Sequence, residues 1–298
     1  MRKNIRPTAA ALAALAVLAT ACGDSGTVTS AAAEAPADAP TVVVTTNILG
    51  DVVRNLVGDQ MNVTTIMPVG ADPHDFQASA QQVSFMESAD ALITNGANFE
   101  EGLFDVIWAA REEGVLTFEA IDAVSTIEFG EGGDVHDDEE EEDGHGHEEG
   151  EDEHGHEEGG ADPHFFTDPA RMALAAEEIA HFLIDNVEGI DAEVLQSNAD
   201  EYVAELEALD AEVSDLFVDL PDDQKVLITN HEVFGYFADN YGFEVVGTVI
   251  PSGSTLDGTA AADLVELTEV IEHEGVPAIF GETSSSDELI QTLSLIHI

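Results

Sequence analysis

The sequence predicts an α/β protein made of two α/β lobes joined by a long helix. Short runs of β-branched and aliphatic residues alternate with amphipathic segments from Thr41 to Phe280, as in mainly parallel sheets covered by helices. One long helical stretch, Asp191 to Leu220, interrupts this alternation. The chain has 298 residues, a length that suits two domains of about 100 to 200 residues each.

The first lobe is expected over residues 41–190. Its four predicted strands are Val42–Thr46, Val63–Met67, Ala91–Thr94 and Val115–Phe118. The predicted helices of this lobe are Ile48–Val57, Ala80–Ser88, Glu100–Glu113 and Pro169–Val187. A linking helix over 191–220 follows from apolar residues at helical spacing, and Pro221 ends it.

The second lobe, expected over residues 221–298, repeats the alternation of strand and helix. Its predicted strands are Val226–Thr229, Glu244–Ile250 and Ala278–Phe280. Its predicted helices are Phe234–Tyr241 and Ala261–Glu274.

The first 40 residues predict a lipoprotein leader followed by a tether. Three basic residues precede a thirteen-residue apolar stretch, Ala9 to Ala21, which is shorter than the about 20 residues of a membrane span and typical of a secretory signal. Leu18 to Ala21 precede Cys22 as in a bacterial lipobox. We expect a signal peptide over 1–21, lipidation of Cys22 and a flexible tether over 22–40. The alternative is a plain cleaved signal with an incidental cysteine.

Charge and cysteine content limit the class of protein. The formal net charge is −56, from 63 acidic and 7 basic residues, so the lack of clustered Lys and Arg argues against binding to nucleic acid and disfavours anionic lipid headgroups. Cations are the natural electrostatic partners of such a chain. Cys22 is the only cysteine, which rules out internal disulfides.

Residues 131–162 break the pattern of the first lobe. The segment contains 17 acidic residues, 5 histidines and 8 glycines and has almost no apolar side chain, so we expect a disordered insertion. Histidines among carboxylates are typical of a weak metal-binding tract, although a solvated acidic loop is the alternative. The histidines are His136, His145, His147, His154 and His156.

Three other histidines stand in polar turns beside predicted strands or helices. His74 follows a strand, His164 precedes a helix, and His231 comes directly after a strand. Ligands of open α/β sheets bind outside the carboxyl ends of the strands, and three imidazoles suit a cation such as Zn²⁺. A turn or cap role is the alternative for each histidine taken alone. The expected acceptors for their rings are Asp72, Asp75, Asp168 and Glu232.

The sequence argues against an enzyme. His231 and Glu232 begin like the metalloprotease motif H-E-x-x-H, but Gly235 stands where the second histidine belongs. No nucleophile elbow, P-loop or dinucleotide fingerprint is present in the sequence.

Several of these segments resemble one family. They are VVVTTNILGDVVRNLVGD from Val42, the GADPH turn that ends at His74, the DPHFFTDP turn from Asp162, and H-x-x-F-G-Y-F-A-x-x-Y-G from His231. In this order they resemble the metal-binding solute-binding proteins of bacterial ABC importers for zinc and manganese, the cluster A-I family. The resemblance covers most of the chain from Thr41 onward.

The resemblance implies a metal site in the cleft between two lobes joined by a rigid helix. His74 and His164 would come from the first lobe and His231 from the second. Manganese-binding relatives commonly carry Glu at the third position, so His231 favours Zn²⁺ as the transported ligand over Mn²⁺. The insertion stands where zinc-specific relatives have His-rich loops.

The function implied is an extracytoplasmic zinc-binding component of an ABC importer. Such a protein captures Zn²⁺ and delivers it to a membrane permease powered by an ATPase. We expect a monomer, lipid-anchored to the outer face of the cytoplasmic membrane. The alternatives are a manganese- or iron-binding homologue and a surface lipoprotein adhesin of the same fold.

The fourth ligand departs from the family pattern. The family's usual Asp lies nearer the C-terminus, in a segment that this chain does not reach. Residues 293–298, LSLIHI, match a reading frame of a common sequencing adapter, so we expect an artefactual truncation of the second lobe. Glu282 or water would then complete the site.

Overall fold

The described part of the computed structural model comprises residues 35–129, 160–276, 278–284, 288, 290, 291 and 293. The predicted signal peptide, Cys22, most of the tether, the five histidines of the insertion and the last five residues lie outside it.

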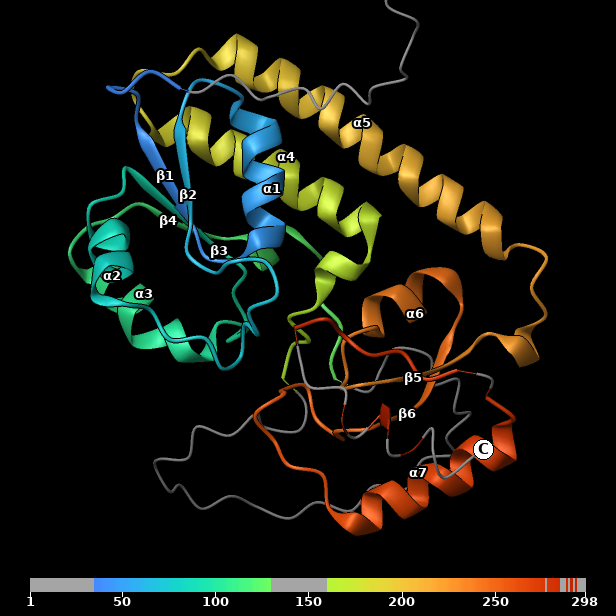
Figure 1. The fold of residues 1–298 in the computed structure, drawn as a ribbon. Helices are drawn as coiled ribbons and strands as arrows, with labels where there is room; N and C mark the ends of the chain where they lie inside the picture. Colours follow the sequence, from blue (N-terminus) through green and yellow to red (C-terminus); the bar gives the residue numbers. More distant parts are fainter. Residues whose placement is uncertain are drawn as a thin grey trace, which may run out of the picture. The chain divides into compact units, whose positions relative to one another are not determined.

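The first lobe is built on a four-stranded parallel sheet with the strand order β2-β1-β3-β4. Its strands are β1 (Thr41–Val44), β2 (Asn62–Thr65), β3 (Ala91–Thr94) and β4 (Thr117–Glu119). Its helices are α1 (Asn47–Val57), α2 (Ala80–Glu87), α3 (Phe104–Glu112) and α4 (Pro169–Asn186). Figure 1 shows α2 and α3 on one side of the sheet and α1 and α4 on the other.

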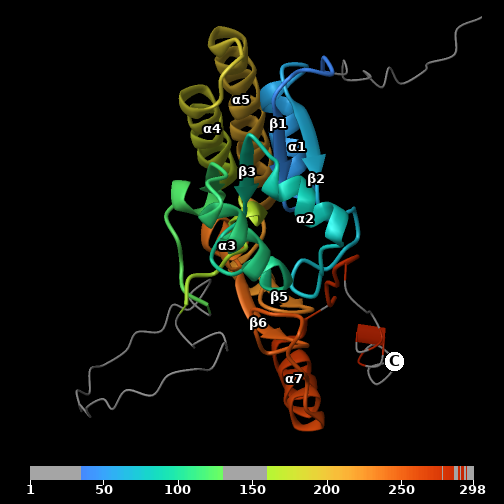
Figure 2. The same cartoon turned by 90° about the vertical axis from the view of Figure 1, so that its left-hand side faces the viewer.

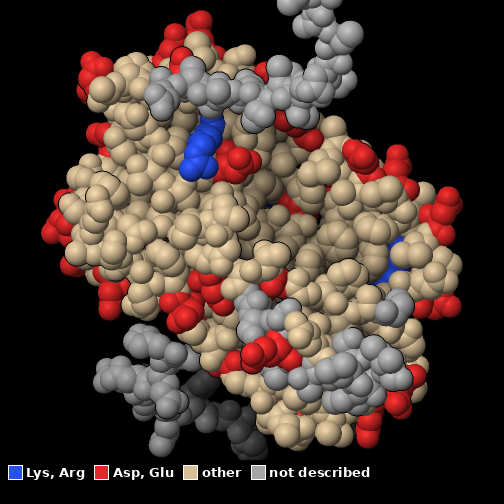
Figure 3. Space-filling view, in the orientation of Figure 1, with Lys and Arg blue, Asp and Glu red and all other residues tan. Residues whose placement is uncertain are grey.

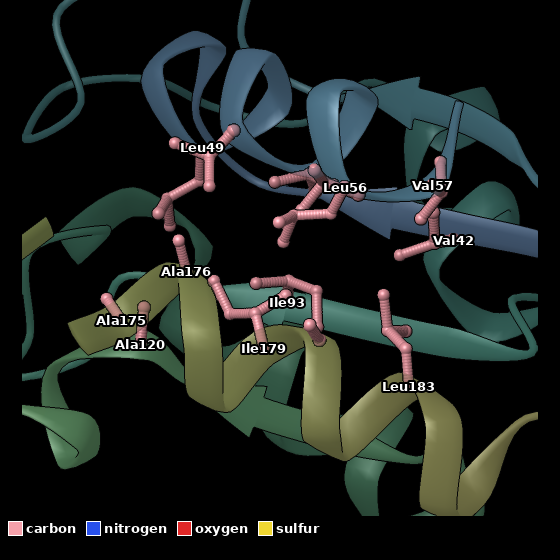
Figure 4. Close-up of a cluster of buried hydrophobic side chains, with 14 of the residues drawn as sticks. Val42, Leu49, Leu56, Val57, Ile93, Ala120, Ala175, Ala176, Ile179 and Leu183 are labelled. Carbon is pink, nitrogen blue, oxygen red and sulfur yellow. The ribbon is translucent and has the colours of Figure 1, made fainter. Parts of the chain in front are cut away.

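The central strand β1 is buried on both faces. Val42 and Val44 pack into the cluster formed with α1 and α4, whereas Val43 packs into the cluster formed with α2 and α3. This division follows the two-residue period of a strand. Figure 4 shows the first cluster, in which Leu56 of α1 and Ile179 of α4 lie near Ile93 of β3.

The long helix α5 (Ala192–Phe217) joins the two lobes. It begins at Asp191, whose side chain accepts hydrogen bonds from the first turn. Its first half packs Leu195 into the core of the first lobe, beside α4 in both views (Figures 1 and 2). Its last residue, Phe217, packs against the second lobe.

The second lobe has a two-stranded parallel sheet of β5 (Val226–Thr229) and β6 (Glu244–Thr248). The helices α6 (Gly235–Tyr241) and α7 (Ala261–Glu274) accompany it. The third predicted strand, Ala278–Phe280, is reduced to one parallel bridge between Phe280 and Thr229. The predicted fold class, two α/β lobes with a long linking helix, is confirmed.

Two predicted helix boundaries differ from the structure by more than two residues. The helix predicted from Glu100 starts at Phe104, because a 3-10 turn at Glu101–Leu103 precedes it. The helix predicted to reach Leu220 ends at Phe217. Within the described residues, no helix has the length and apolarity that a bilayer crossing requires.

Candidate metal centre

His74 is held in place by a turn after β2. Its backbone N–H donates to Oδ1 of Asp72 (3.0 Å), an Asx turn that reverses the chain two residues beyond the acceptor. The side chain points inward and is 1% exposed. The turn thus fixes the imidazole at the edge of the first lobe.

His164 is held by the same kind of turn as His74. Its backbone N–H donates to Oδ1 of Asp162 (2.9 Å), and Asn95 donates to the carbonyl of Pro163 (2.9 Å). Asp168 then caps α4 by accepting from the backbone N–H of Ala170 (2.9 Å). The segment is therefore tied to β3 on one side and to the start of α4 on the other.

His231 lies in the second lobe, two residues beyond the end of β5. Thr229 donates its hydroxyl to the carbonyl of His231 (2.7 Å), so the end of the strand positions the ligand segment. The side chain is 1% exposed.

The three imidazoles converge between the lobes. One nitrogen from each ring lies within 4.8 Å of the others. Nε2 of His164 and Nε2 of His231 are 3.3 Å apart, and Nε2 of His74 is buried without a hydrogen-bond partner among the described residues. The cluster consists of histidines only.

Each imidazole contacts a carboxylate through its other nitrogen. Nδ1 of His74 lies 3.0 Å from Glu101, Nδ1 of His164 lies 2.7 Å from Asp162, and Nδ1 of His231 lies 2.8 Å from Glu282. A carboxylate hydrogen-bonded to Nδ1, as at His74 and His164, favours a proton there and leaves the lone pair on Nε2. The contact of His231 with Glu282 is close but lacks hydrogen-bond geometry. The rings of His74 and His164 are thereby oriented by a carboxylate, and Nε2 of His231 faces Nε2 of His164.

Glu101 reaches His74 because of two local features. The preceding Glu100 is buried and accepts from the backbone N–H groups of Asn95 (2.6 Å) and Gly96 (3.3 Å), and burial raises the pKa of its carboxyl. A Cβ atom at Gly102 would collide with the carbonyl oxygen of Phe76. Only glycine allows this close approach of the two loops.

The acceptors expected from the sequence are wrong as partners of the rings. Asp72 binds the backbone of His74 and Asp168 caps α4. Asp75 is exposed, and Glu232 lines a different pocket, shared with Asp162. The carboxylates at the rings are Glu101, Asp162 and Glu282.

Asp162 belongs to a tripeptide that occurs twice in the chain. The tripeptide Asp-Pro-His occurs at 72–74 and again at 162–164, and the predicted disordered insertion over 131–162 includes Asp162. It is 2% exposed, and residues 127–129 pair with residues 160–162. The ordered chain therefore resumes before the predicted end. Glu101, 27 residues from His74, had no local signal.

The environment of Asp162 is strongly desolvating. Burial raises the pKa of Asp162 to about 7, against the opposing effects of the His164 backbone N–H and of His231. Burial and the neighbouring Asp162 also raise the pKa of Glu232. A cation at the three Nε2 atoms would favour the ionised form of Asp162.

A cleft leads to the histidines from outside. Residues of the first lobe, among them Ile48, Val69 and Asp72, line it together with Thr255 and Glu282 of the second. Figure 3 shows acidic side chains spread over the visible face and few basic ones. The electrostatic setting thus favours cations.

Comparisons with known proteins give consistent matches. The family model described as periplasmic zinc-uptake complex component A matches residues 42–295. The manganese-binding lipoprotein MntA of Halalkalibacterium halodurans is 26% identical over 281 residues, covering 94% of this chain and 82% of the relative. The zinc-binding protein TroA of Treponema pallidum is 29% identical over 255 residues, covering 85% and 73%.

Solved structures show the same fold. The structure of TroA from Treponema pallidum matches with a TM-score of 0.69 at 26% identity, over 86% of this chain and 82% of that one. A crystal structure of ZnuA matches with a TM-score of 0.70 at 22% identity, over 87% and 88%.

Proposed function

Because this chain belongs to the family of periplasmic zinc-uptake component A proteins, which are solute-binding proteins of metal ABC importers and not enzymes, we propose that it captures Zn²⁺ outside the cytoplasm. The metal would bind to Nε2 of His74, His164 and His231. The observation that carries the proposal is the convergence of three buried imidazoles whose Nδ1 atoms all contact carboxylates.

Zinc suits this set of ligands better than manganese. Imidazole nitrogen is a good ligand for Zn²⁺, whereas Mn²⁺ prefers carboxylate, carbonyl and water oxygens. Zn–N bonds of about 2.0–2.1 Å in a tetrahedron separate neighbouring nitrogens by about 3.3 Å. The distance between His164 and His231 equals this edge. Relatives are named for manganese as well as zinc, so cargo is the part of the proposal that needs measurement.

Glu282 is proposed as an orienting carboxylate. Its oxygen lies on the Nδ1 side of His231 (2.8 Å), away from the Nε2 atom that faces His164. This placement supports a role in holding the ring, and it leaves the fourth coordination position to solvent or another oxygen.

The partners proposed are a membrane permease and its ATPase, which would receive the metal from a monomeric protein. Lipidation of Cys22 would keep the protein at the outer face of the cytoplasmic membrane. Relatives named as lipoproteins support this anchor. Adhesion, the alternative drawn from the sequence, has no comparable support from a described contact, so metal capture is the function proposed.

The five histidines of the insertion are proposed as weak auxiliary ligands. The described residues that flank this segment lie close to the three converging histidines. The ring of Phe129 is centred 6.4 Å from that of His164, and Glu128 forms a β-bridge with Ala161. Metal held by the insertion would thus be concentrated near the tight site.

The test is a titration of metal-free protein with Zn²⁺ and with Mn²⁺ against a competing chelator. We expect one tight zinc site, weaker manganese binding, and loss of the tight site in His74→Ala. Tighter binding of Mn²⁺ than Zn²⁺ would contradict the proposed cargo. Zinc uptake by cells carrying the gene, lost in the same variant, would test delivery.

A further inference from the structure

One oxygen of Glu101 joins the two lobes. Oε1 lies 3.0 Å from Nδ1 of His74 in the first lobe, and the hydroxyl of Ser254 in the second lobe donates to the same oxygen (2.6 Å). Ser254 is 1% exposed, so water competes poorly for this charge-assisted hydrogen bond.

A second carboxylate repeats the connection. Oδ1 of Asp72 accepts from the backbone N–H of His74 (3.0 Å), while its Oδ2 accepts from the hydroxyl of Thr255 (2.7 Å). The ring and the backbone of His74 are therefore each linked, through one carboxylate, to consecutive residues of the second lobe.

The loop that supplies Ser254 is also connected to His231. The backbone N–H of Ser254 donates to Oγ of Ser252 (3.1 Å), and the carbonyl of Ser252 accepts from the N–H of Glu232 (3.1 Å), the residue after His231. A continuous set of hydrogen bonds thus leads from one histidine to another across the cleft.

The lobes also meet at α6, without a hydrogen bond to a ligand ring. Arg171 of α4 pairs with Asp239 of α6 (2.7 Å) and lies over the ring of Tyr236, 4.8 Å from its centre. Tyr236 is fully buried in the core cluster of the first lobe. This contact combines an ion pair with a buried aromatic ring, whereas the contact at Glu101 depends on single hydrogen bonds.

We propose that Glu101 is a positioning residue that couples the hold on the metal to closure of the lobes, a proposal that rests on the proposed metal capture. In the closed form, Ser254 fixes the carboxylate that orients the ring of His74. Separation of the lobes at this edge removes the Ser254 hydroxyl and loosens the ring. The movement that opens the cleft thereby weakens the bond from His74 to the metal.

The test is a double-mutant cycle on zinc affinity in the full chain. The variants are Glu101→Ala, Ser254→Ala and the pair, with the zinc dissociation constant measured by chelator competition. We expect Glu101→Ala to weaken binding about 10- to 100-fold, as for other groups that orient a ligand. Ser254→Ala should weaken it several-fold, and the pair should bind no more weakly than Glu101→Ala alone. Independent effects, in which the two losses multiply, would overturn the proposal.

A matched control is Asp239→Ala, which breaks the ion pair that Arg171 makes between the lobes. Its effect on zinc affinity should be small and should multiply with that of Ser254→Ala. The contrary result is a departure from multiplying losses in the pair of Asp239→Ala and Ser254→Ala. A departure as large as that of the pair of Glu101→Ala and Ser254→Ala would overturn the specific role of Glu101. Thermal unfolding of each metal-free variant identifies any loss of affinity that arises from loss of folding, and the cycle is then read from variants that unfold as the wild type does.

Failure of the proposed function gives a different result. If the wild-type protein lacks a saturable zinc site, metal capture itself is wrong. If the wild type binds zinc tightly and Glu101→Ala binds equally well, only the coupling is wrong. Stopped-flow release of zinc to a chelator should be faster in Ser254→Ala than in the wild type, and an unchanged rate would also contradict the coupling.

Discussion

Nε2 of His164 and Nε2 of His231 lie 3.3 Å apart, although the two side chains belong to different lobes. Nδ1 of His164 lies 2.7 Å from Asp162 and Nδ1 of His231 lies 2.8 Å from Glu282, so the two Nε2 atoms are the ones that face each other across this gap. Such an arrangement is unfavourable without a proton or a cation between the nitrogens. A metal ion removes this repulsion and links the lobes at the same time.

Replacing His231 with Glu should shift the metal preference toward manganese. The substitution exchanges an imidazole nitrogen for carboxylate oxygens, which suit Mn²⁺ better than Zn²⁺. We expect the ratio of zinc to manganese affinity to fall by at least about tenfold, equal to about 1.4 kcal/mol, in competition titrations. The control is His181→Glu, the same change at a half-exposed position of α4. An unchanged ratio in His231→Glu would remove His231 from the site.

Asp162→Asn should change how the stability of the metal-free protein depends on pH. Burial raises the folded-state pKa of Asp162 from 3.8 to about 7, so between these values the folded protein holds a proton that the unfolded chain has lost. The resulting contribution to stability is present at low pH and is lost as the pH rises through about 7. Its slope is at most about 1.4 kcal/mol per pH unit.

Urea unfolding between pH 5 and pH 8 measures this effect. The decline in stability with rising pH should be shallower in Asp162→Asn than in the wild type. Asp185→Asn, at an exposed position of α4, is the matched control for the lost charge. Parallel profiles of stability against pH for the wild type and Asp162→Asn would show that the carboxyl of Asp162 does not titrate between pH 5 and pH 8 in the folded protein.

Deleting residues 131–159 should leave one tight zinc site and remove weaker ones, because the three converging histidines and Asp162 are retained. A deletion extended to 162 removes the carboxylate at Nδ1 of His164 and should also weaken the tight site, by about 10- to 100-fold. Calorimetric titration distinguishes the two. The same stoichiometry before and after the shorter deletion would argue against metal binding by the insertion.

Ile179→Ala should reduce stability without a comparable loss of zinc affinity. Ile179 of α4 is fully buried and points toward Ile93 of β3 (Figure 4), and truncating such a side chain typically costs about 2–5 kcal/mol. Chemical unfolding of the metal-free variant gives the cost, and a zinc titration under folding conditions gives the affinity. A large loss of affinity in a fully folded variant would mean that the site depends on this core more directly than its contacts indicate.

The sequence was sufficient to predict the fold class and to single out the histidines that the fold brings together. Strands such as β1 and β3 are buried on both faces and read as continuous apolar runs. The candidate ligands follow an Asp-Pro turn or come directly after a strand. At these positions the local sequence pattern and the order of strands and helices both predict a ligand at the edge of a sheet.

The carboxylates that orient the rings could not be found in the same way. Glu101 reaches His74 only because Gly102 permits close contact with the loop at Phe76, a tertiary effect without sequence periodicity. The predicted final strand at Ala278–Phe280 forms a single bridge to Thr229, since β propensity alone does not establish a ladder.

The most direct test of the account is the anomalous scattering of zinc in crystals of the protein loaded with one equivalent of metal. We predict one strong peak at the zinc edge, about 2.0–2.1 Å from Nε2 of each of His74, His164 and His231. A principal peak elsewhere, or one bound through Nδ1 of these rings, would contradict the account.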